Sequence, residues 1–506
     1  MELLAAHWPV LLCLLVYLAA CFAIGWHFSQ RASRGVADFY IAKRSVPGWV
    51  VSLAFFSTFA STNTYIGQAG QAFASGLSWA WVGVLWTAFC MVSWLLLGPR
   101  LRNQTVGLKS VTVPDYFDFR YRSPLSRPTR VLSALTILFA TLWYMAGIAK
   151  GCAHLLETVL DVPYGWGVLA ILGFTCVYTV MGGMYSVLWT DALQGVMMLL
   201  VAVVMAAIPF VYAGGVGPLF ERISQTSHVS VAGTPIGDGL VTFGALVSVT
   251  YIVGIGLSVG MKQIAEPRCL VRFYSIDSAD GMRFAMIWTP VFLGVSLVCV
   301  MGLGALVHGM ASDQEAAALI ANTDQVVGFM LAKFDNTAVS AFCITGLFAA
   351  GMSSLASVML IVGTAAVGDI RNLWVRSDPL STVRWTRVAI VVYSGVVALV
   401  TLFPPAGVVE LTSFSGAVFA AGFFPAVFGG LYLRWGTGHG AFWSMLAGMA
   451  ATLLWRFGVR FNVEGLQDVH EIIPAFCLSL AVYVVVSRMT HRHQPPADHL
   501  ARVFGD

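Results

Sequence analysis

Residues 57–70 read Ser57-Thr-Phe-Ala-Ser-Thr-Asn-Thr-Tyr-Ile-Gly-Gln-Ala-Gly70 and lie inside an apolar segment that spans residues 46–77. Half of these residues carry a hydroxyl or an amide, Tyr65 adds a phenol, and none is charged. An unpaired polar group is costly in a bilayer, so such side chains face a protein interior or a water-filled cavity. The stretch therefore predicts a membrane helix that is broken at mid-membrane and lines a site. The alternative is a helix packed tightly through its small and hydroxyl-bearing residues.

The composition of the whole chain is that of a polytopic membrane protein. Of its 506 residues 58% are hydrophobic and 10% are charged, whereas about a quarter of a soluble protein is charged. The first apolar run lacks a basic leader and a small-residue cleavage site, so we expect a retained span rather than a signal peptide. Since a span needs about 20 apolar residues, we predict thirteen spans: 8–28, 46–73, 78–99, 131–157, 163–181, 187–213, 240–262, 284–309, 337–367, 385–403, 409–433, 438–457 and 470–488.

The distribution of basic residues predicts the orientation. The net charge is +4, and most of the 28 Lys and Arg residues fall in alternate loops between the predicted spans. Basic loops stay in the cytoplasm. We therefore predict a multi-pass protein of the cell (inner) membrane with its N-terminus outside and its C-terminus in the cytoplasm. Residues 489–506 are expected to form a solvated cytoplasmic tail.

The order of the spans suggests an internal repeat within one transmembrane domain, residues 1–506. Residues 46–213 and 240–433 each hold five spans, and each set opens on a helix that we expect glycines to interrupt, at 55–70 and at 244–260. An odd number of spans per set inserts the two sets in opposite orientations, which is typical of inverted-repeat transporters with a site at mid-membrane. The remaining spans are an extra N-terminal helix, 8–28, and two additional helices, 438–488.

Two further polar segments lie in predicted spans. Residues 349–357 contain Ser353, Ser354 and Ser357 within little more than one helical turn. Their hydroxyls suit a hard monovalent cation, although serines also pack helices together. Residues 182–194 contain Asp191, which could stabilise a cation inside the membrane or simply complement the dipole at a helix N-terminus.

These segments together resemble the sodium:solute symporter family. The run Gly-Gly-Met-Tyr-Ser-Val-Leu-Trp-Thr-Asp-Ala-Leu-Gln at 182–194 is similar to a family hallmark, as is the Ala-x-x-Ser-Ser pattern that begins at Ala350. Phe424-Pro425 with the following residues to Gly448 resembles the eleventh and twelfth spans of the family, and residues 266–278 resemble the loop after the seventh. The resemblance covers about residues 8–488 and implies an all-α, LeuT-like fold with two inverted five-helix repeats plus extra helices.

The resemblance also implies a sodium site. Carried over by position, backbone carbonyls and two hydroxyls would bind Na⁺ as the coupling ion; these residues are Ala60, Asn63, Ala350, Ser353 and Ser354. Some relatives hold a second sodium, for which Asp191 and Ser357 are candidates here. Ala356 lacks the hydroxyl that is common at its position, so the second set is incomplete and one sodium per cycle is favoured.

The resemblance places substrate contacts on the first, third and sixth core helices. The candidates are Thr62, Asn63, Thr64, Tyr65, Gln68, Trp143 and Gln263. Such an uncharged polar and aromatic lining suits a small carboxylate-bearing solute held by backbone N–H groups at a half-helix N-terminus. The 57–70 stretch resembles the pantothenate and monocarboxylate branch more closely than the proline branch, which tends to have an aspartate where this chain has Thr62.

Two lysines in predicted spans each allow two interpretations. Lys262 is expected to extend to the cytoplasmic interface, and the alternative is a counter-charge for an anionic substrate. Lys150 could extend outward, or it could occupy a cavity and alter or replace cation coupling.

The sequence predicts a sodium-coupled secondary symporter that imports a small organic solute, such as a monocarboxylate, a pantothenate-like molecule or an amino acid, by alternating access. Alternatives are a proton-coupled or sodium-independent transporter of the same fold, or a membrane sensor. No catalytic motif, Walker A loop or metal-ligand spacing occurs, so we do not expect an enzyme. The expected partners are the solute and the lipid bilayer, with no nucleic acid and no obligatory protein partner.

Overall fold

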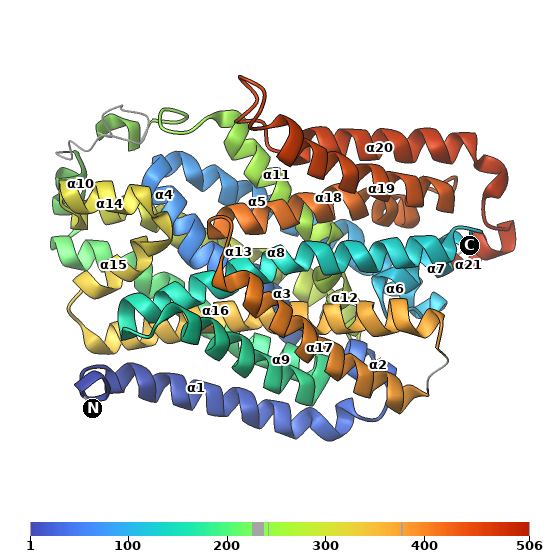
Figure 1. The fold of residues 1–506 in the computed structure, drawn as a ribbon, viewed down its shortest axis with the longest axis horizontal. Helices are drawn as coiled ribbons and strands as arrows, with labels where there is room; N and C mark the ends of the chain where they lie inside the picture. Colours follow the sequence, from blue (N-terminus) through green and yellow to red (C-terminus); the bar gives the residue numbers. More distant parts are fainter. Residues whose placement is uncertain (1, 225–236, 241, 376–377, 505–506) are drawn as a thin grey trace.

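The computed structural model describes residues 2–224, 237–240, 242–375 and 378–504, and this part of the chain is helical without a β-strand. Ten of its helices are long and apolar enough to cross a membrane. The helices form one bundle in which the N-terminus and the C-terminus lie at opposite ends (Figure 1).

Most of the predicted spans correspond to single helices. They are α1 (Glu2–Ala32), α5 (Ala80–Val92), α8 (Ser126–Leu160), α13 (Ala279–Val307), α16 (Thr337–Thr364), α17 (Pro379–Leu402), α18 (Val408–Tyr432), α19 (Gly438–Leu454) and α20 (Ile472–Met489). Two predicted spans share α9 (Tyr164–Ala213), whose 50 residues turn at Gly183 with φ 52° and ψ −145°. A Cβ at Gly183 would lie 2.9 Å from the Phe39 carbonyl oxygen, so this turn requires glycine.

The predicted break in the second span is confirmed. Helix α3 (Gly48–Phe59) ends at Ala60, and the chain resumes as one turn of π-helix, η2 (Asn63–Gln68), followed by α4 (Ala69–Ser75). Ser61 organises the break, because its carbonyl accepts hydrogen bonds from the amides of Thr64 and Tyr65 and its Oγ accepts one from the Asn63 amide, 3.2 Å away. Serine competes with the helical backbone in this way and favours such interruptions.

The prediction for the seventh span is wrong about where the helix breaks. The glycines of 244–260 that lie in α11 (Val249–Ala265) do not interrupt it; the chain instead turns at Glu266, with ψ 128°, and continues as α12 (Pro267–Ser275), where a loop was expected. Proline has no N–H to continue a helix and drives the preceding residue to extended geometry. The glycines serve packing: a Cβ at Gly254 or Gly256 would lie within 2.4 Å of a neighbouring side chain.

The two broken helices lie against each other. An isolated bridge pairs Val46 with Ile276, so the segment before α3 is fixed to the end of α12. At the breaks, the Arg268 guanidinium donates a hydrogen bond to the Thr58 carbonyl over 2.8 Å. This contact places both interruptions in one buried region of the bundle.

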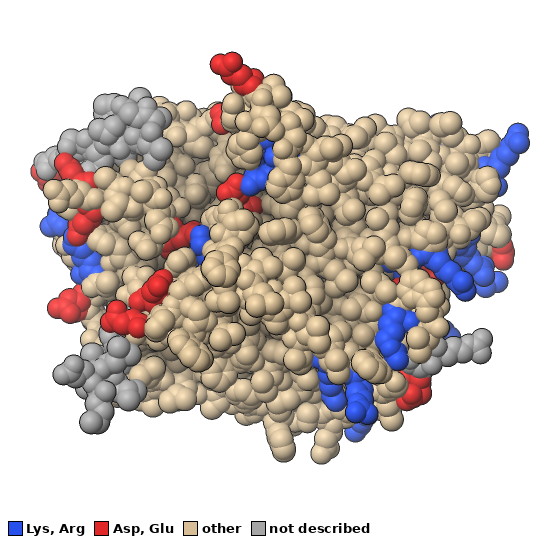
Figure 2. Space-filling model, viewed as in Figure 1, with Lys and Arg blue, Asp and Glu red and all other residues tan. Residues whose placement is uncertain are grey.

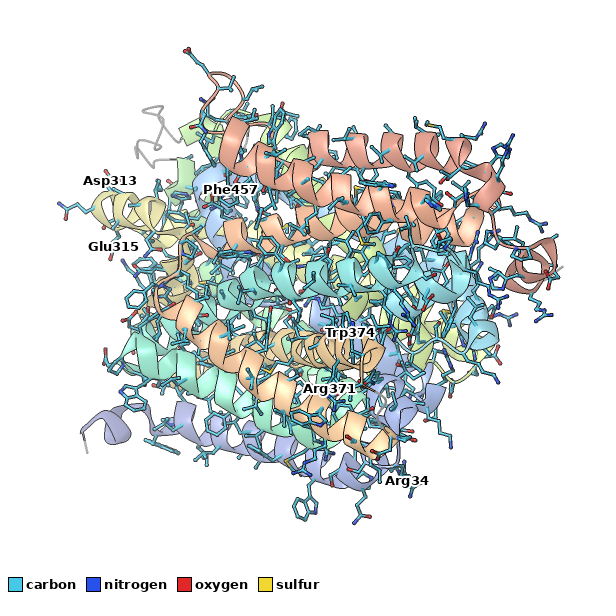
Figure 3. All side chains as sticks on the ribbon, turned by 45° about the vertical axis from the view of Figure 1, so that its right-hand side comes forward. Arg34, Asp313, Glu315, Arg371, Trp374 and Phe457 are labelled. Atoms are coloured by element: carbon cyan, nitrogen blue, oxygen red, sulfur yellow. The ribbon has the colours of Figure 1, made fainter. Side chains whose placement is uncertain are left out.

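Short helices occupy the long connections. They are α2 (Val36–Ile41), α6 (Gly98–Leu108), α7 (Val113–Tyr121), α10 (Val216–Ser224), α14 (Asp313–Ala321), η7 (Thr323–Gln325) and α15 (Val326–Lys333). Charges separate along the bundle, with Asp and Glu gathered near α14 and Lys and Arg near the opposite end (Figure 2). We call these the acidic end, with Asp313 and Glu315, and the basic end, with Arg34 and Arg371 (Figure 3).

The C-terminal tail is not a fully solvated segment, contrary to expectation. Residues of α21 (Ala497–Phe504) pack onto the basic end, where Val503 is buried. The Arg120 guanidinium lies 5.0 Å from the centre of the Phe504 ring and donates to the Gly430 carbonyl. The tail therefore packs against α6 and α7 at this end.

Candidate functional site

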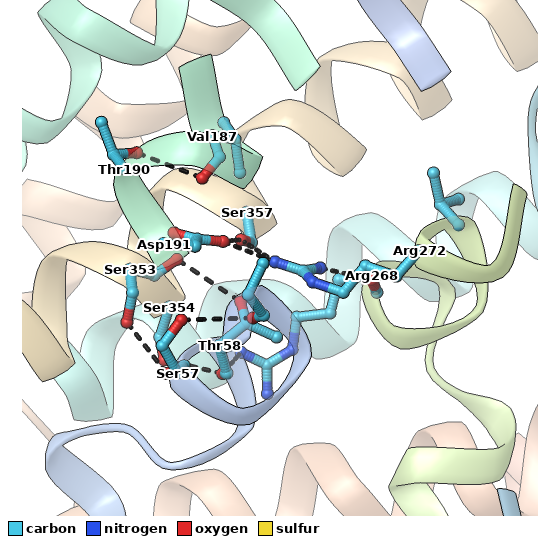
Figure 4. A network of polar contacts seen from close by, with 12 residues as sticks. Ser57, Thr58, Val187, Thr190, Asp191, Arg268, Arg272, Ser353, Ser354 and Ser357 are labelled. Carbon is cyan, nitrogen blue, oxygen red and sulfur yellow. Dashed lines mark hydrogen bonds and ion pairs between the residues drawn. The ribbon is translucent and has the colours of Figure 1, made fainter. Parts of the chain in front are cut away.

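Two serines of α16 meet the last turn of α3. Ser353 Oγ donates to the Ser57 carbonyl over 2.9 Å, and Ser354 Oγ donates to the Thr58 carbonyl over 2.8 Å (Figure 4). All four residues are buried. The Ala-x-x-Ser-Ser pattern thus faces the break that the 57–70 stretch predicted.

The other predicted sodium ligands lie at the same junction. Ala60 leaves the helix with φ −77° and ψ 77°, and within the described ranges no hydrogen bond reaches its buried carbonyl. The Ala350 carbonyl accepts from Ser353 Oγ over 3.1 Å. Asn63 begins η2 directly after the break. The serine hydroxyls bond to the carbonyls of Ser57 and Thr58, which precede Ala60 and Asn63 in the chain.

This set of atoms is compatible with sodium. An orphaned buried carbonyl is costly unless a partner satisfies it, and carbonyl and hydroxyl oxygens are ligands that hard cations prefer. The unwinding of α3 frees such oxygens, and α16 brings two hydroxyls to the same place. The ligand assignment itself stays a prediction.

Asp191, a candidate for a second sodium, is paired with Arg272 of α12. Arg272 Nη2 lies 2.6 Å from Asp191 Oδ2 and 2.7 Å from Ser357 Oγ, and the Ser357 hydroxyl donates to the same carboxylate over 3.0 Å. All three side chains are buried (Figure 4). A cation of the chain therefore lies between the two residues that were predicted to bind a second ion.

The predicted substrate residues of the first core helix do not all face one space. The Tyr65 hydroxyl bonds to the Met198 carbonyl and to Ser296, and Thr62 Oγ1 donates to the Ile148 carbonyl of α8. These two side chains join the break to neighbouring helices. Two of the remaining candidates bond to each other, since Gln68 donates to Asn63, and Gln68 also accepts a hydrogen bond from Trp79. The buried hydroxyl of the third, Thr64, has no partner among the described residues.

Trp143 and Gln263 lie elsewhere in the core. Trp143 packs between Phe139 and Phe414, with ring centres 6.1 and 6.3 Å away. Gln263 Nε2 donates to the Trp86 carbonyl over 2.8 Å, and its Oε1 is buried without a partner in the described part of the chain. No hydrogen bond in that part joins either residue to Thr62 or Tyr65.

A charged cluster at the second break was missing from the predicted site residues. It comprises Tyr144 of α8 and Lys262, Glu266 and Arg268 around the α11–α12 turn. Lys262 was expected to reach the interface, but it is 1% exposed, so that prediction is wrong. Its Nζ lies 3.6 Å from the Tyr144 ring centre and 3.7 Å from Glu266 Oε2. Three charges beside Pro267 in an apolar span were the available signal, since charges inside a membrane mark functional sites.

Lys150 lies at the acidic end of the bundle and is not part of the cluster around Lys262. Its Nζ lies 3.0 Å from Asp324 Oδ2 of η7 and 3.2 Å from the Ala406 carbonyl. The same carboxylate accepts from the Val408 amide at the start of α18. The lysine thus links α8, η7 and α18.

Comparisons with known proteins agree with this architecture. The model of the sodium:solute symporter family matches residues 39–448. The chain is 26% identical over 502 residues to the osmoregulated proline transporter OpuE of Bacillus subtilis, covering 98% of this chain and 97% of that protein. It is 28% identical over 492 residues to the sodium/proline symporter of Escherichia coli, covering 96% and 94%.

Solved structures show the same fold. A sodium-coupled sialic acid symporter in a substrate-bound outward-open state aligns with a TM-score of 0.79 at 18% identity, over 96% of this chain and 98% of that chain. A nucleobase-cation-symport-1 family transporter in a closed conformation aligns with a TM-score of 0.54 at 14% identity, over 92% and 98%. The predicted all-helical LeuT-like fold is confirmed.

Proposed function

We propose that this chain, which belongs to the sodium:solute symporter family, uses the sodium gradient to import a small solute that bears a carboxylate. The observation that carries the proposal is the junction of α3 and α16. There the Ser353 and Ser354 hydroxyls bond to carbonyls in the last turn of α3, and the unwound backbone beyond it leaves the Ala60 carbonyl without a partner among the described residues.

Sodium enters this scheme as the co-transported ion. Ala60, Asn63 and Ala350 would supply carbonyl oxygens, and Ser353 and Ser354 hydroxyl oxygens. An ion held by both helices would stabilise the arrangement in which α3 and α16 are joined, and its release would free them to separate. Each charge that moves down the membrane potential supplies about 2.3 kcal/mol per 100 mV. We propose one sodium per cycle, because the carboxylate of Asp191 already has a partner in Arg272.

The orientation follows from the charge separation. We place the acidic end outside the cell and the basic end in the cytoplasm, because Lys and Arg favour cytoplasmic loops. The distribution in Figure 2 supports this placement. The N-terminus then lies outside, and the docked α21 lies on the cytoplasmic side of the cell membrane.

The solute panel should span the families of carboxylates that the comparisons and the sequence suggest. Both relatives described above are named for proline, whereas the 57–70 stretch resembles the pantothenate and monocarboxylate branch. Purified protein in sealed vesicles would be tested with proline, pantothenate and short monocarboxylates, with inward gradients of sodium, of protons, or of neither.

The decisive variants are Ser353→Ala and Ser354→Ala. Loss of an oxygen that contacts a charge costs about 1.5–3 kcal/mol, so the sodium concentration for half-maximal uptake should rise about 10–100-fold. The matched control is Thr345→Val on the same helix, because the Thr345 hydroxyl is buried and bonds only to its own helix, at the Ala341 carbonyl. The control should keep the wild-type sodium dependence. Uptake that ignores sodium and both serine variants contradicts the proposal, and uptake driven by protons alone would replace sodium with proton coupling.

A further inference from the structure

The second break carries an unbalanced buried charge. Glu266 Oε2 lies 2.7 Å from Arg268 Nε and 3.7 Å from Lys262 Nζ, and all three residues are at most 2% exposed. Arg272 is balanced separately by Asp191. One carboxylate thus faces two cations, and the cluster holds one positive charge in excess. A buried charge without a counter-charge is unfavourable, which favours an anion as the missing partner.

The excess charge falls on Lys262. Arg268 is held by Glu266 and by the Thr58 carbonyl, but the three N–H donors of Lys262 reach no acceptor within hydrogen-bonding distance among the described residues. Other buried polar atoms of these segments have no hydrogen-bond partner in the described part of the chain: the Tyr144 hydroxyl, the two Glu266 carboxylate oxygens, the Trp86 indole nitrogen and Gln263 Oε1. The Trp86 carbonyl accepts a hydrogen bond from the side chain of Gln263, the residue after Lys262.

This group of unpaired atoms lies beside the proposed sodium site. Arg268 bonds to the same Thr58 carbonyl that Ser354 contacts, and Phe59, the last residue of α3, packs its ring edge-on against Trp86. A ligand of Lys262 would therefore lie between the two broken helices. Solute sites of broken-helix transporters lie at such a position.

The aromatic ring at the cluster is already covered by cations. Lys262 Nζ lies 3.6 Å and Arg268 Cζ lies 4.1 Å from the centre of the Tyr144 ring. An amino-acid substrate brings an ammonium group that needs a carboxylate, a carbonyl or an aromatic face. Here two cations already lie against the ring, and Glu266, the carboxylate of this cluster, already faces both of them.

We propose, building on the function proposed above, that Lys262 binds the carboxylate of the solute. The ammonium group of Lys262 then occupies the position that the α-ammonium group of an amino acid would need. The site then selects monoanionic carboxylates without an α-amino group and discriminates against zwitterionic amino acids. The residues involved are Lys262 as the anion-binding group and Tyr144, Glu266 and Arg268 as the groups that position it.

Matched solute pairs test this selectivity on the unaltered protein. Cyclopentanecarboxylate and proline share one ring size, and lactate and alanine differ by a hydroxyl in place of the ammonium. In vesicle uptake assays with an inward sodium gradient and in sodium-dependent thermal stabilisation, we expect each anion to be preferred over its zwitterionic partner by at least tenfold. Equal or better transport of the zwitterions overturns the inference while leaving sodium-coupled carboxylate uptake standing. No sodium-dependent response to any member of either pair or to pantothenate overturns both proposals.

A variant then assigns the selectivity to the lysine. Lys262→Met keeps an unbranched side chain that is one atom shorter and removes its charge, and the exposed Lys109→Met is the control. We expect Lys262→Met to lose the anion preference by at least tenfold, with Lys109→Met unchanged. A structural role alone would lower thermal stability and leave the ratio of anion to zwitterion unchanged, which overturns the assignment. If Lys262→Met does not fold, Lys262→Arg is tested instead, because it keeps the charge. We expect Lys262→Arg to retain the preference for the anion over the zwitterion, and loss of that preference overturns the assignment.

Discussion

The two broken helices use the same backbone device with different side chains. The first break, from Ala60 to Thr62, lies among hydroxyls and carbonyls and contains no charged residue; Arg268, which donates to the Thr58 carbonyl, comes from the second break. The second, at Glu266, is flanked by Lys262, Arg268 and Arg272. An interrupted helix only frees backbone groups. The neighbouring side chains decide whether those groups suit a cation or an anion, and here each break favours a different sign of charge.

The difference should be visible first in stability, because a charged break depends on intact ion pairs. Asp191→Asn leaves the buried Arg272 without its carboxylate, and breaking a buried pair costs about 3–5 kcal/mol. We expect the largest fall in thermal stability of the purified protein from this change. Removing both charges, with Asp191→Asn and Arg272→Gln together, should recover part of the loss.

The control for that change is an exposed ion pair. Arg283 and Asp280 lie 3.2 Å apart with side chains that are 79% and 90% exposed, so Asp280→Asn should change stability little. An Asp191→Asn protein as stable as the Asp280→Asn protein would show that the second break does not rest on its charges.

The uncharged break should depend on close packing instead. A Cβ at Gly70 would lie 2.0 Å from the Thr323 carbonyl oxygen, and overpacking of this kind costs about 1–3 kcal/mol. Gly70→Ala should therefore lower thermal stability by an intermediate amount and slow uptake, because α4 can no longer approach η7. Gly107→Ala, where nothing lies within 4 Å of the added Cβ, is the control. A Gly70→Ala protein with wild-type melting and uptake would contradict this account.

The smallest effect is expected at Tyr65. Its hydroxyl bonds to the Met198 carbonyl and Ser296, so Tyr65→Phe should cost about 1 kcal/mol of stability and leave the solute concentration for half-maximal uptake unchanged. The measurement separates a packing role from the substrate contact predicted by sequence. A tenfold weaker apparent affinity at unchanged stability would restore the substrate role.

Local patterns predicted the first break and its partner well. A run of uncharged polar residues in an apolar span can satisfy its polar groups only against protein, and in the structure Ser353 and Ser354 bond to the carbonyls of Ser57 and Thr58. The second break was misplaced for a local reason as well. Gly254 and Gly256 were taken as a helix interruption, but they accommodate His470 and Leu85, and the rigid Pro267 ends the helix.

The partners of individual side chains could not be predicted. The rotation of α8, α9 and α11 about their axes decides which groups these side chains meet. It determines whether Tyr65 faces a solute or Met198, and whether Lys262 reaches an interface or Tyr144. Helix rotation is set by packing over hundreds of residues, to which hydropathy is insensitive. The charges themselves were visible, and their cost inside a membrane was the usable signal.

The carbonyl oxygen of Thr58 has a thermodynamic consequence. It accepts hydrogen bonds from Ser354 of α16 and from Arg268 of α12, so one acceptor oxygen is shared by a residue of the proposed ion site and a residue of the proposed anion site. Any ligand that redirects Ser354 changes the strength of the bond left to Arg268. Linkage is reciprocal: the factor by which sodium raises solute affinity must equal the factor by which solute raises sodium affinity, and this shared acceptor is one atom through which that coupling free energy can be expressed.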